Sequence, residues 1–198
     1  MANKNPEQRA ATRRKIMDAY TALFKERPDG SVTASAVIQA ASVNRSTFYD
    51  YFDSVADLQR AVEDDLLAAI AETARAAIVS GADLDIIALV SRTYTDHGEL
   101  IGLMIGEHGS ASFIARIKES LKPLVIRVLP GGTSENELAY VAEFVTSGLI
   151  SLYALWFSRE KDIPLEELAP FARSLVFSCL ERREAPVEGA GDLINAAR

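Results

Sequence analysis

The stretch SVTASAVIQAASVNRSTFYDYFDSV, residues 31–55, determines the fold expected for this 198-residue chain. Its apolar spacing predicts two short helices joined by a tight turn at residues 41–43. Phe48 and Phe52 lie four residues apart, so they fall on one buried face of the second helix. The polar and aromatic side chains around them remain for the outside. This arrangement predicts a helix-turn-helix whose second helix enters the major groove of DNA.

The same residues resemble the DNA-binding region of TetR/AcrR-type transcriptional regulators. The resemblance rests on the start of the first helix, the turn, the second helix and one later leucine: Val32-Thr33, Ala41-Ser42-Val43, Ser46-Thr47-Phe48-Tyr49-Asp50-Tyr51-Phe52 and Leu58. The segment before them, roughly residues 9–25, fits as well, because its apolar residues recur at helical spacing. The specific match covers about the first third of the chain. Beyond it only the all-helical layout agrees, and two packed helices without a DNA-binding role are the alternative.

Two positions depart from the family pattern. The family usually has glycine in the turn, where the backbone is left-handed, and Ser42 stands there instead. A non-glycine residue in this conformation costs roughly 1 kcal/mol. The family also often has a lysine after the second phenylalanine, where it contacts a DNA phosphate, and this chain has Val55. Together with Asp50 and Asp53, Val55 predicts either modest affinity for DNA or a basic segment elsewhere that compensates.

The charge of the chain is uneven. Its net charge of −7 argues against a general nucleic-acid binder. Residues 1–60, however, hold nine Lys or Arg and seven Asp or Glu, whereas the remainder holds twelve and twenty-one. The segment 1–15 predicts either a basic arm that contacts phosphates or simply the solvated start of a helix. Its basic residues are Lys4, Arg9, Arg13, Arg14 and Lys15.

The rest of the chain has helical periodicity, and no segment has the pattern of a strand. Capping boxes are expected at Ser54 with Asp57 and at Ser134 with Glu137. We expect an all-α protein of about nine helices, with an HTH DNA-binding head over residues 1–53. A helical body follows over 54–184, to which the resemblance assigns ligand binding and dimerisation, and then a disordered tail over 185–198. Beyond the head, helices are expected over about 54–81, 83–97, 111–129, 135–159 and 164–183, with the glycine-spaced segment 98–106 as a tightly packed or yielding joint.

The outward side chains of the two short helices are the candidates for DNA contact. Arg45 is the candidate for a base contact, because arginine pairs bidentately with guanine. Asn44 is expected to cap the second helix. Asp50 either accepts a hydrogen bond from cytosine or only lowers non-specific affinity, and the others are expected to hold phosphates or touch thymine methyl groups. The set is Thr33, Ser35, Asn44, Arg45, Ser46, Thr47, Tyr49, Asp50 and Tyr51.

The last two expected helices are apolar most of the way round, which requires burial on most sides. This pattern favours a four-helix bundle shared by two subunits over packing within one chain, and the resemblance implies the same homodimer. The candidate interface residues are Leu149, Leu152, Trp156, Phe171, Leu175 and Cys179.

The resemblance also implies a small-molecule effector bound inside the body. Its pocket is expected between the helix that starts at Ser54 and the helices over 83–97, 111–129 and 135–159. Aromatic and methionine side chains there would suit a largely apolar ligand with one or two polar groups, although ordinary core packing explains the same residues. The candidates are Tyr94, His97, Met104, Phe113, Ile117, Tyr140, Phe144 and Ser147.

Other functional classes find little support in the sequence. There is no glycine-rich phosphate loop after a strand and no nucleophile motif, which argues against an enzyme and gives no cofactor. His97 and His108 make a metal site conceivable, but their spacing matches no ligand motif. No signal peptide is expected. We also expect no apolar stretch to reach the roughly 18 residues that span a membrane. The single Cys179 suits the reducing cytoplasm.

These observations predict a cytoplasmic, homodimeric regulator that binds an inverted-repeat DNA operator and responds to a small molecule. A repressor is expected, with an activator as the less common form. The alternative is a small-molecule-binding or scaffold protein in which DNA binding is weakened or lost, which Val55 and the acidic total favour. A metal-dependent enzyme is the third possibility.

Overall fold

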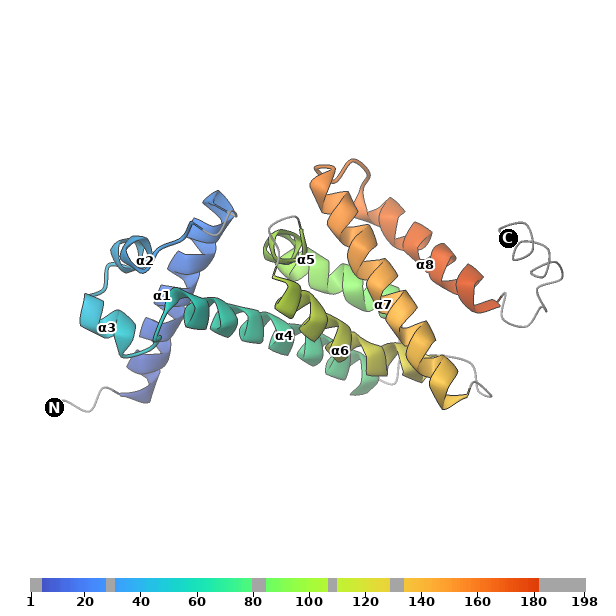
Figure 1. Cartoon of the computed structure of the whole chain (residues 1–198), viewed down its shortest axis with the longest axis horizontal. Helices are drawn as coiled ribbons and strands as arrows, with labels where there is room; N and C mark the ends of the chain where they lie inside the picture. Colours follow the sequence, from blue (N-terminus) through green and yellow to red (C-terminus); the bar gives the residue numbers. More distant parts are fainter. Residues whose placement is uncertain (1–4, 28–30, 80–84, 107–109, 129–133, 182–198) are drawn as a thin grey trace, which may run out of the picture.

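The computed structural model describes residues 5–27, 31–79, 85–106, 110–128 and 134–181. All regular elements of the described residues are helices, and Figure 1 shows α1–α3 as a head at one end of the molecule. The helix α4 runs from this head along the body formed by α5–α8 (Figure 1). The bounds are α1 (Pro6–Glu26), α2 (Ala34–Ala40), α3 (Arg45–Tyr49), α4 (Val55–Val79), α5 (Ile86–Ile105), α6 (Ala111–Val128), α7 (Glu135–Ser158) and α8 (Leu165–Glu181).

The head is built around Phe48, whose side chain is fully buried. Its ring lies 6.1 Å from the ring of Phe52, so the two phenylalanines share the buried face expected from their spacing. On α1, Ile16 and Tyr20 belong to the same apolar cluster, together with Val37 of α2. The cluster continues through α4 into the body, so the head and the body share one continuous apolar core.

The turn between α2 and α3 has the left-handed backbone that the sequence predicts. Ser42 has a φ of 46°, and its N–H donates to the carbonyl of Gln39 while the N–H of Val43 donates to that of Ile38. This pair of bonds is the Schellman ending of a helix, in which glycine is the usual residue. Asn44 occupies the N-cap of α3, but its side chain makes no capping hydrogen bond, which corrects the capping role expected for it.

Both expected capping sites start helices. The Oγ of Ser54 accepts from the N–H of Asp57 at 3.1 Å. In a capping box the carboxylate of Asp57 would accept from the backbone N–H of Ser54. Here it accepts from the backbone N–H of Asp53, one residue earlier. At α7, Ser134 and Glu137 form a complete capping box.

The segment around the glycines is not a joint. Helix α5 runs without a break from Ile86 to Ile105, which reduces the expected nine helices to eight in the described residues. Gly102 faces the ring of Phe157 on α7, and a Cβ atom at this position would collide with that ring. The glycine is therefore a point of close helix packing, and the interpretation of residues 98–106 as a yielding joint is wrong.

Helix α7 is the most apolar helix of the body. Among the described residues it is the one helix long and apolar enough to cross a membrane by length and composition. This finding corrects the expectation that no segment reaches such a length. One side of α7 packs in the body, where Ala142, Val145 and Thr146 are buried, and its other side forms an exposed apolar face described below.

Candidate nucleic-acid interface and buried cavity

Helix α3 presents a polar and aromatic surface to solvent. Arg45, Ser46 and Asp50 are exposed, and Thr47 is half-buried. The guanidinium of Arg45 lies 5.5 Å from the centre of the Tyr49 ring, which is 44% exposed. A cation–π contact of this kind holds a flexible side chain near one orientation. Arg45 is therefore exposed on α3 with its guanidinium beside the Tyr49 ring, one turn further along the helix.

The start of α2 supplies two further hydroxyls. Thr33 is the N-cap of α2, and its Oγ1 accepts from the N–H of Ala36 at 3.3 Å. Its hydroxyl proton remains available to donate to a phosphate oxygen. Ser35 is exposed in the first turn of the same helix.

Tyr51 does not face outward as expected. Its residue is half-buried, and its Oη is buried with no hydrogen-bond partner among the described residues. Arg9 of α1 lies 5.4 Å from the centre of its ring. The Tyr51 hydroxyl is thus closed off from a DNA phosphate, because the chain has already turned away from α3 toward α4.

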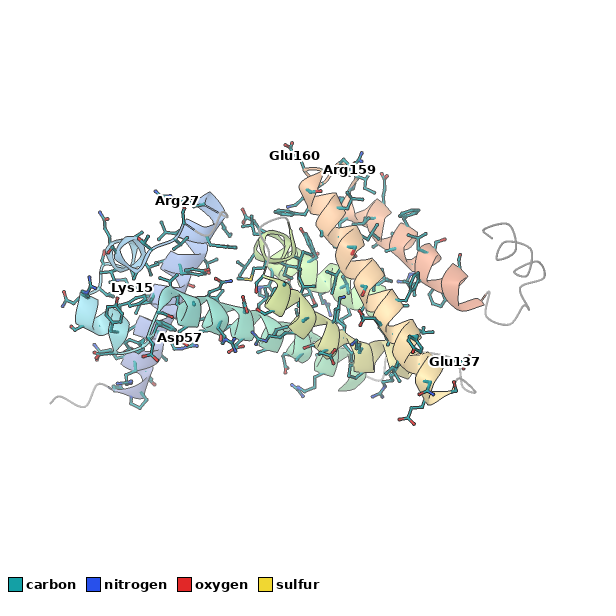
Figure 2. All side chains as sticks on the ribbon, viewed as in Figure 1. Lys15, Arg27, Asp57, Glu137, Arg159 and Glu160 are labelled. Atoms are coloured by element: carbon teal, nitrogen blue, oxygen red, sulfur yellow. The ribbon has the colours of Figure 1, made fainter. Side chains whose placement is uncertain are left out.

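The basic residues of α1 divide into two groups. Arg9 and Arg13 lie over the rings of Tyr51 and Phe52, so they take part in packing the head. Arg14 and Lys15 are exposed, and Figure 2 shows Lys15 on the head. Lys4 lies outside the described residues. Arg9, Arg14 and Lys15 are therefore the exposed basic residues of the first half of α1.

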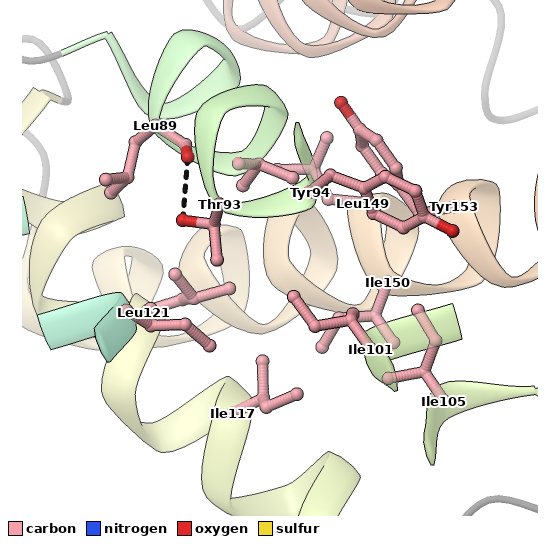
Figure 3. Close-up of a pocket in the computed structure, with 12 residues that line it drawn as sticks. Leu89, Thr93, Tyr94, Ile101, Ile105, Ile117, Leu121, Leu149, Ile150 and Tyr153 are labelled. Atoms are coloured by element: carbon pink, nitrogen blue, oxygen red, sulfur yellow. Dashed lines mark hydrogen bonds between the residues drawn. The ribbon is translucent and has the colours of Figure 1, made fainter. Parts of the chain in front are cut away.

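The body encloses an apolar cavity between α4, α5, α6 and α7 (Figure 3). Its volume is about 50 Å³, below the roughly 300–1,000 Å³ of small-molecule sites, so a ligand larger than a few atoms has to push its walls apart. These are the four helices between which the sequence places a pocket. The lining residues are Ile70, Leu89, Val90, Thr93, Tyr94, Ile101, Ile105, Ile117, Leu121, Leu149, Ile150 and Tyr153.

The polar groups of the cavity wall are few, and none of the lining residues is charged. The Oγ1 of Thr93 donates to the carbonyl of Leu89 at 2.9 Å (Figure 3). Tyr153 shares a hydrogen bond of 3.1 Å with Ser91. The Oη of Tyr94 is buried without a partner among the described residues. Burial, followed by the neighbouring Tyr153, raises the pKa of Tyr94 to about 12, so this hydroxyl stays protonated at neutral pH.

The eight residues expected at the pocket are scattered. Tyr94 and Ile117 line the cavity, while Met104 and Phe113 are buried in the core outside its lining. His97 is exposed, and Tyr140 and Phe144 are 79% and 64% exposed on α7. Ser147 bonds to the carboxylate of Glu143. The aliphatic majority of the lining was missed, because isoleucine and leucine at these positions have the spacing of any buried helix face.

Exposed apolar side chains gather on α7 and α8. The described residues include eight exposed large hydrophobic ones, of which six lie on these two helices. A groove between the helices has a volume of about 350 Å³, and Ser151 is the one side chain with a polar group among its lining residues. We define the α7–α8 face as four exposed residues: Phe144, Leu155 and Leu175, which line the groove, and Phe171, one turn before Leu175 on α8. An uncovered apolar patch of this kind marks an interaction surface.

Two expected interface residues turn out to be internal. Trp156 is 5% exposed, and its Nε1–H donates to the carbonyl of Ile163 at 2.7 Å. Its ring packs against Tyr94 and Tyr153, with centroids 5.0 and 6.2 Å away. Leu149 is also buried, and it separates the cavity from the groove. Leu152 is half-buried in the groove, and the side chain of Cys179 lies outside the described set.

Among the described residues, no three His, Cys, Asp or Glu side chains gather around a point that could hold a metal ion. His108 lies outside the described residues.

A helix-turn-helix head on an all-helical body defines a helix-turn-helix transcriptional regulator rather than an enzyme. Residues 16–62 match the family described as "Bacterial regulatory proteins, tetR family". Residues 84–178 match its "Transcriptional regulator C-terminal region". The chain belongs to the TetR family of transcriptional regulators. No curated protein sequence shows a significant match to this chain.

Solved structures of TetR regulators share the fold. A TetR regulator from Streptococcus agalactiae is 19% identical, with a TM-score of 0.66 over 86% of this chain and 96% of that one. The fatty acid degradation regulator FadR from Bacillus halodurans is 14% identical, with a TM-score of 0.69 over 88% and 96%. FadR from Thermus thermophilus, a repressor in complex with lauroyl-CoA, is 22% identical, with a TM-score of 0.56 over 90% and 100%.

Proposed function

We propose that this chain is a cytoplasmic, homodimeric repressor that binds an inverted-repeat operator and releases it when a small apolar molecule occupies the cavity. The exposed surface of α3, with Arg45 held over Tyr49, carries the DNA-binding part of the proposal. In a dimer, two such helices would enter major grooves about one turn of DNA apart. Activation of transcription by the same protein is the second form that the fold permits.

The chemistry of the cavity supports an uncharged, mainly aliphatic effector. Nine of its lining residues are Ile, Leu or Val, and the other three carry hydroxyls. A charged group inside such a cavity would lose its hydration without gaining an ionic partner, at a large free-energy cost. The Tyr94 hydroxyl is buried without a partner among the described residues, and it could bond one polar atom of a ligand once its ring has turned toward the cavity. FadR from Thermus thermophilus, which is similar to this chain in fold, is in complex with lauroyl-CoA. That complex is consistent with an acyl-like ligand for this chain.

The α7–α8 face supports the dimer. Its members are 45–64% exposed in the single chain, and a second copy of the same face would cover them. Homodimers of this kind are two-fold symmetric, so each apolar residue meets the same surface on its partner. Occupancy of the cavity would then change the spacing of the two heads, provided that the ligand prefers one spacing over the other.

The proposal is tested by incubating the purified protein with a random duplex library at about 100 mM salt, where non-specific phosphate contacts are already weakened. We expect the retained DNA to share a palindromic motif. If a folded dimer enriches no motif, with or without an aliphatic ligand, DNA binding has been lost and the small-molecule-binding alternative stands.

Replacing Arg45 with alanine should weaken binding to the selected motif by about 1–3 kcal/mol and relax the preference at one base pair. The loss follows from removal of a bidentate contact to guanine. Fluorescence anisotropy with the motif and its single-base variants measures both effects. Arg92→Ala, an exposed arginine on α5 of the body, is the matched control. Equal affinities for the wild type and Arg45→Ala would remove Arg45 from the base-reading surface.

For the cavity, 1-decanol should bind at least about tenfold more tightly than decanoate, because the lining has no cation to neutralise a carboxylate. Trp156, the single tryptophan of the chain, contacts two residues of the wall, Tyr94 and Tyr153. Its fluorescence therefore serves as the readout of a titration. Ile117→Phe should reduce the binding by filling the cavity, whereas Ile126→Phe, at an exposed position of α6, should not. Equally tight binding of decanoate would contradict an uncharged ligand.

A further inference from the structure

Arg116 of α6 holds two consecutive carboxylates of α4. Its Nη1 donates to the Oε2 of Glu63 at 3.1 Å, and its Nη2 is paired with the Oδ1 of Asp64. Consecutive side chains leave a helix about 100° apart, so the planar guanidinium spans the side of α4 rather than touching it at one point. We call this group the Arg116 clasp: Arg116, Glu63 and Asp64.

Glu63 is the buried member of the clasp. Its side chain is 5% exposed, and its second oxygen accepts from the amide of Gln59 at 3.0 Å. A buried carboxylate needs a partner to remain charged in the interior. The hydrogen bonds from Arg116 and Gln59 occupy both carboxylate oxygens of Glu63. Glu63 therefore links α4 to α6 through a buried ion pair.

Helix α4 packs on the head beside the clasp, since Val62 and Leu66 share the buried apolar cluster of Tyr20 on α1. Tyr20 of α1 is 2% exposed, and burial followed by the negative charge of Glu63 raises its pKa to about 12. The carboxylate of Glu63 is therefore close to the helix on which the DNA-binding head is built. Among the described residues, two ion pairs link α1 to the helices of the body, Arg13 with Asp65 at 3.8 Å and Lys25 with Glu99 at 2.6 Å. Both are exposed, and exposed pairs contribute little.

The same two helices form part of the cavity wall. Ile117, the residue after Arg116, lines the cavity, as does Ile70, two turns along α4 from Glu63. A ligand that displaces α6 from α4 would therefore act on the clasp directly. Coupling between two sites is carried by a contiguous set of contacts such as this one, from the cavity wall through the clasp to α1.

We propose that Arg116 is a positioning residue: by holding Glu63 and Asp64 it fixes the angle between the DNA-binding head and the body, and it carries the state of the cavity to the head. The second half of this proposal rests on the proposed ligand-responsive function. The first half does not, since it concerns the free protein alone. Arg116 itself makes no contact with operator or effector in this scheme.

The distance between head and body tests the first half. Spin labels are placed on cysteines at Gln39→Cys of α2 and Asn136→Cys of α7, both exposed positions, in a Cys179→Ala background. The labelled protein is mixed with an excess of unlabelled chain, so that the measured distances lie within one subunit. Double electron–electron resonance should give a narrow distribution for this background and a broader or shifted one for Arg116→Gln.

Three further variants keep this test decisive. Arg75→Gln breaks the exposed pair of Arg75 with Glu72, which lies wholly within α4, and should leave the distribution unchanged. Glu63→Gln removes the buried negative charge, while Arg116 keeps its ion pair with Asp64. This variant therefore tests the role of the clasp if Arg116→Gln does not fold. Arg116→Lys should restore the distribution in part, because an ammonium ion cannot hold two carboxylates in a planar fork. Unchanged distributions in folded Arg116→Gln or Glu63→Gln would overturn the proposal.

Operator binding tests the second half. In wild-type protein we expect 1-decanol to lower the affinity for the selected palindrome, and in Arg116→Gln the ratio of affinities without and with 1-decanol should fall toward one. A ratio equal to that of the wild type would show that the clasp does not carry the signal. If no palindrome is selected at all, the proposed function fails, and the distance measurement still decides whether Arg116 positions the head.

Discussion

Replacement of Phe48 by alanine is expected to lower the free energy of unfolding by about 3–5 kcal/mol, the usual result of removing a buried phenyl ring. The side chain is fully buried and contacts Phe52 within the cluster that joins α1, α2 and α4. The cavity left by the ring should not close easily, because residues of α1, α2 and α4 belong to the same buried cluster. Since marginal stability is only about 5–15 kcal/mol, the head should lose a large part of its order. DNA binding should fall below detection.

The neighbouring Tyr49 supplies the control for Phe48. Its ring is 44% exposed and meets the Phe48 ring at its edge, 5.2 Å away. Tyr49→Ala should therefore change the stability by less than about 1 kcal/mol, the size of one partly exposed aromatic contact, while it weakens DNA binding. Urea denaturation followed by circular dichroism measures the stability of both variants. A similar loss of stability in the two would mean that the head is not organised around Phe48.

The head could be predicted from sequence because its determinants are local. The four-residue spacing of Phe48 and Phe52 defines one helix face, and the short interval between the helices leaves one kind of turn. Ser42 adopts the left-handed backbone even without glycine, since the flanking helices fix it. Tyr51 was misplaced because α3 ends at Tyr49, so the helical geometry used to project Tyr51 outward no longer applies there.

The body could be predicted only in outline, because its choices depend on contacts between distant helices. Gly98 and Gly102 weaken a helix by propensity, but the missing side chain of Gly102 lets the ring of Phe157 pack against α5. A helix that is apolar all round, such as α7, does not reveal which side is internal. Trp156 and Leu149 therefore looked like interface residues, whereas Phe144, expected in the ligand pocket, lies on the exposed α7–α8 face.

Leu175→Glu is expected to convert the proposed dimer to monomers, with the dissociation constant raised at least about a hundredfold, or roughly 3 kcal/mol. Leu175 is 45% exposed and lines the α7–α8 groove, so in a single chain the new carboxylate would remain in water. In a two-fold symmetric dimer it would be buried beside apolar groups of the partner, which is strongly unfavourable. Sedimentation velocity over a range of protein concentrations measures the change.

Phe177→Glu is the matched control, because Phe177 is 51% exposed on the same helix but about 200° around it from Leu175. It should leave the dimer intact. Trp156→Glu should behave differently from both, since Trp156 is internal: the body should unfold, and loss of the dimer would follow from loss of the fold. Thermal unfolding separates these cases, as Leu175→Glu should remain a folded monomer. A Leu175→Glu protein that stays dimeric would place the subunit interface on another face of the body.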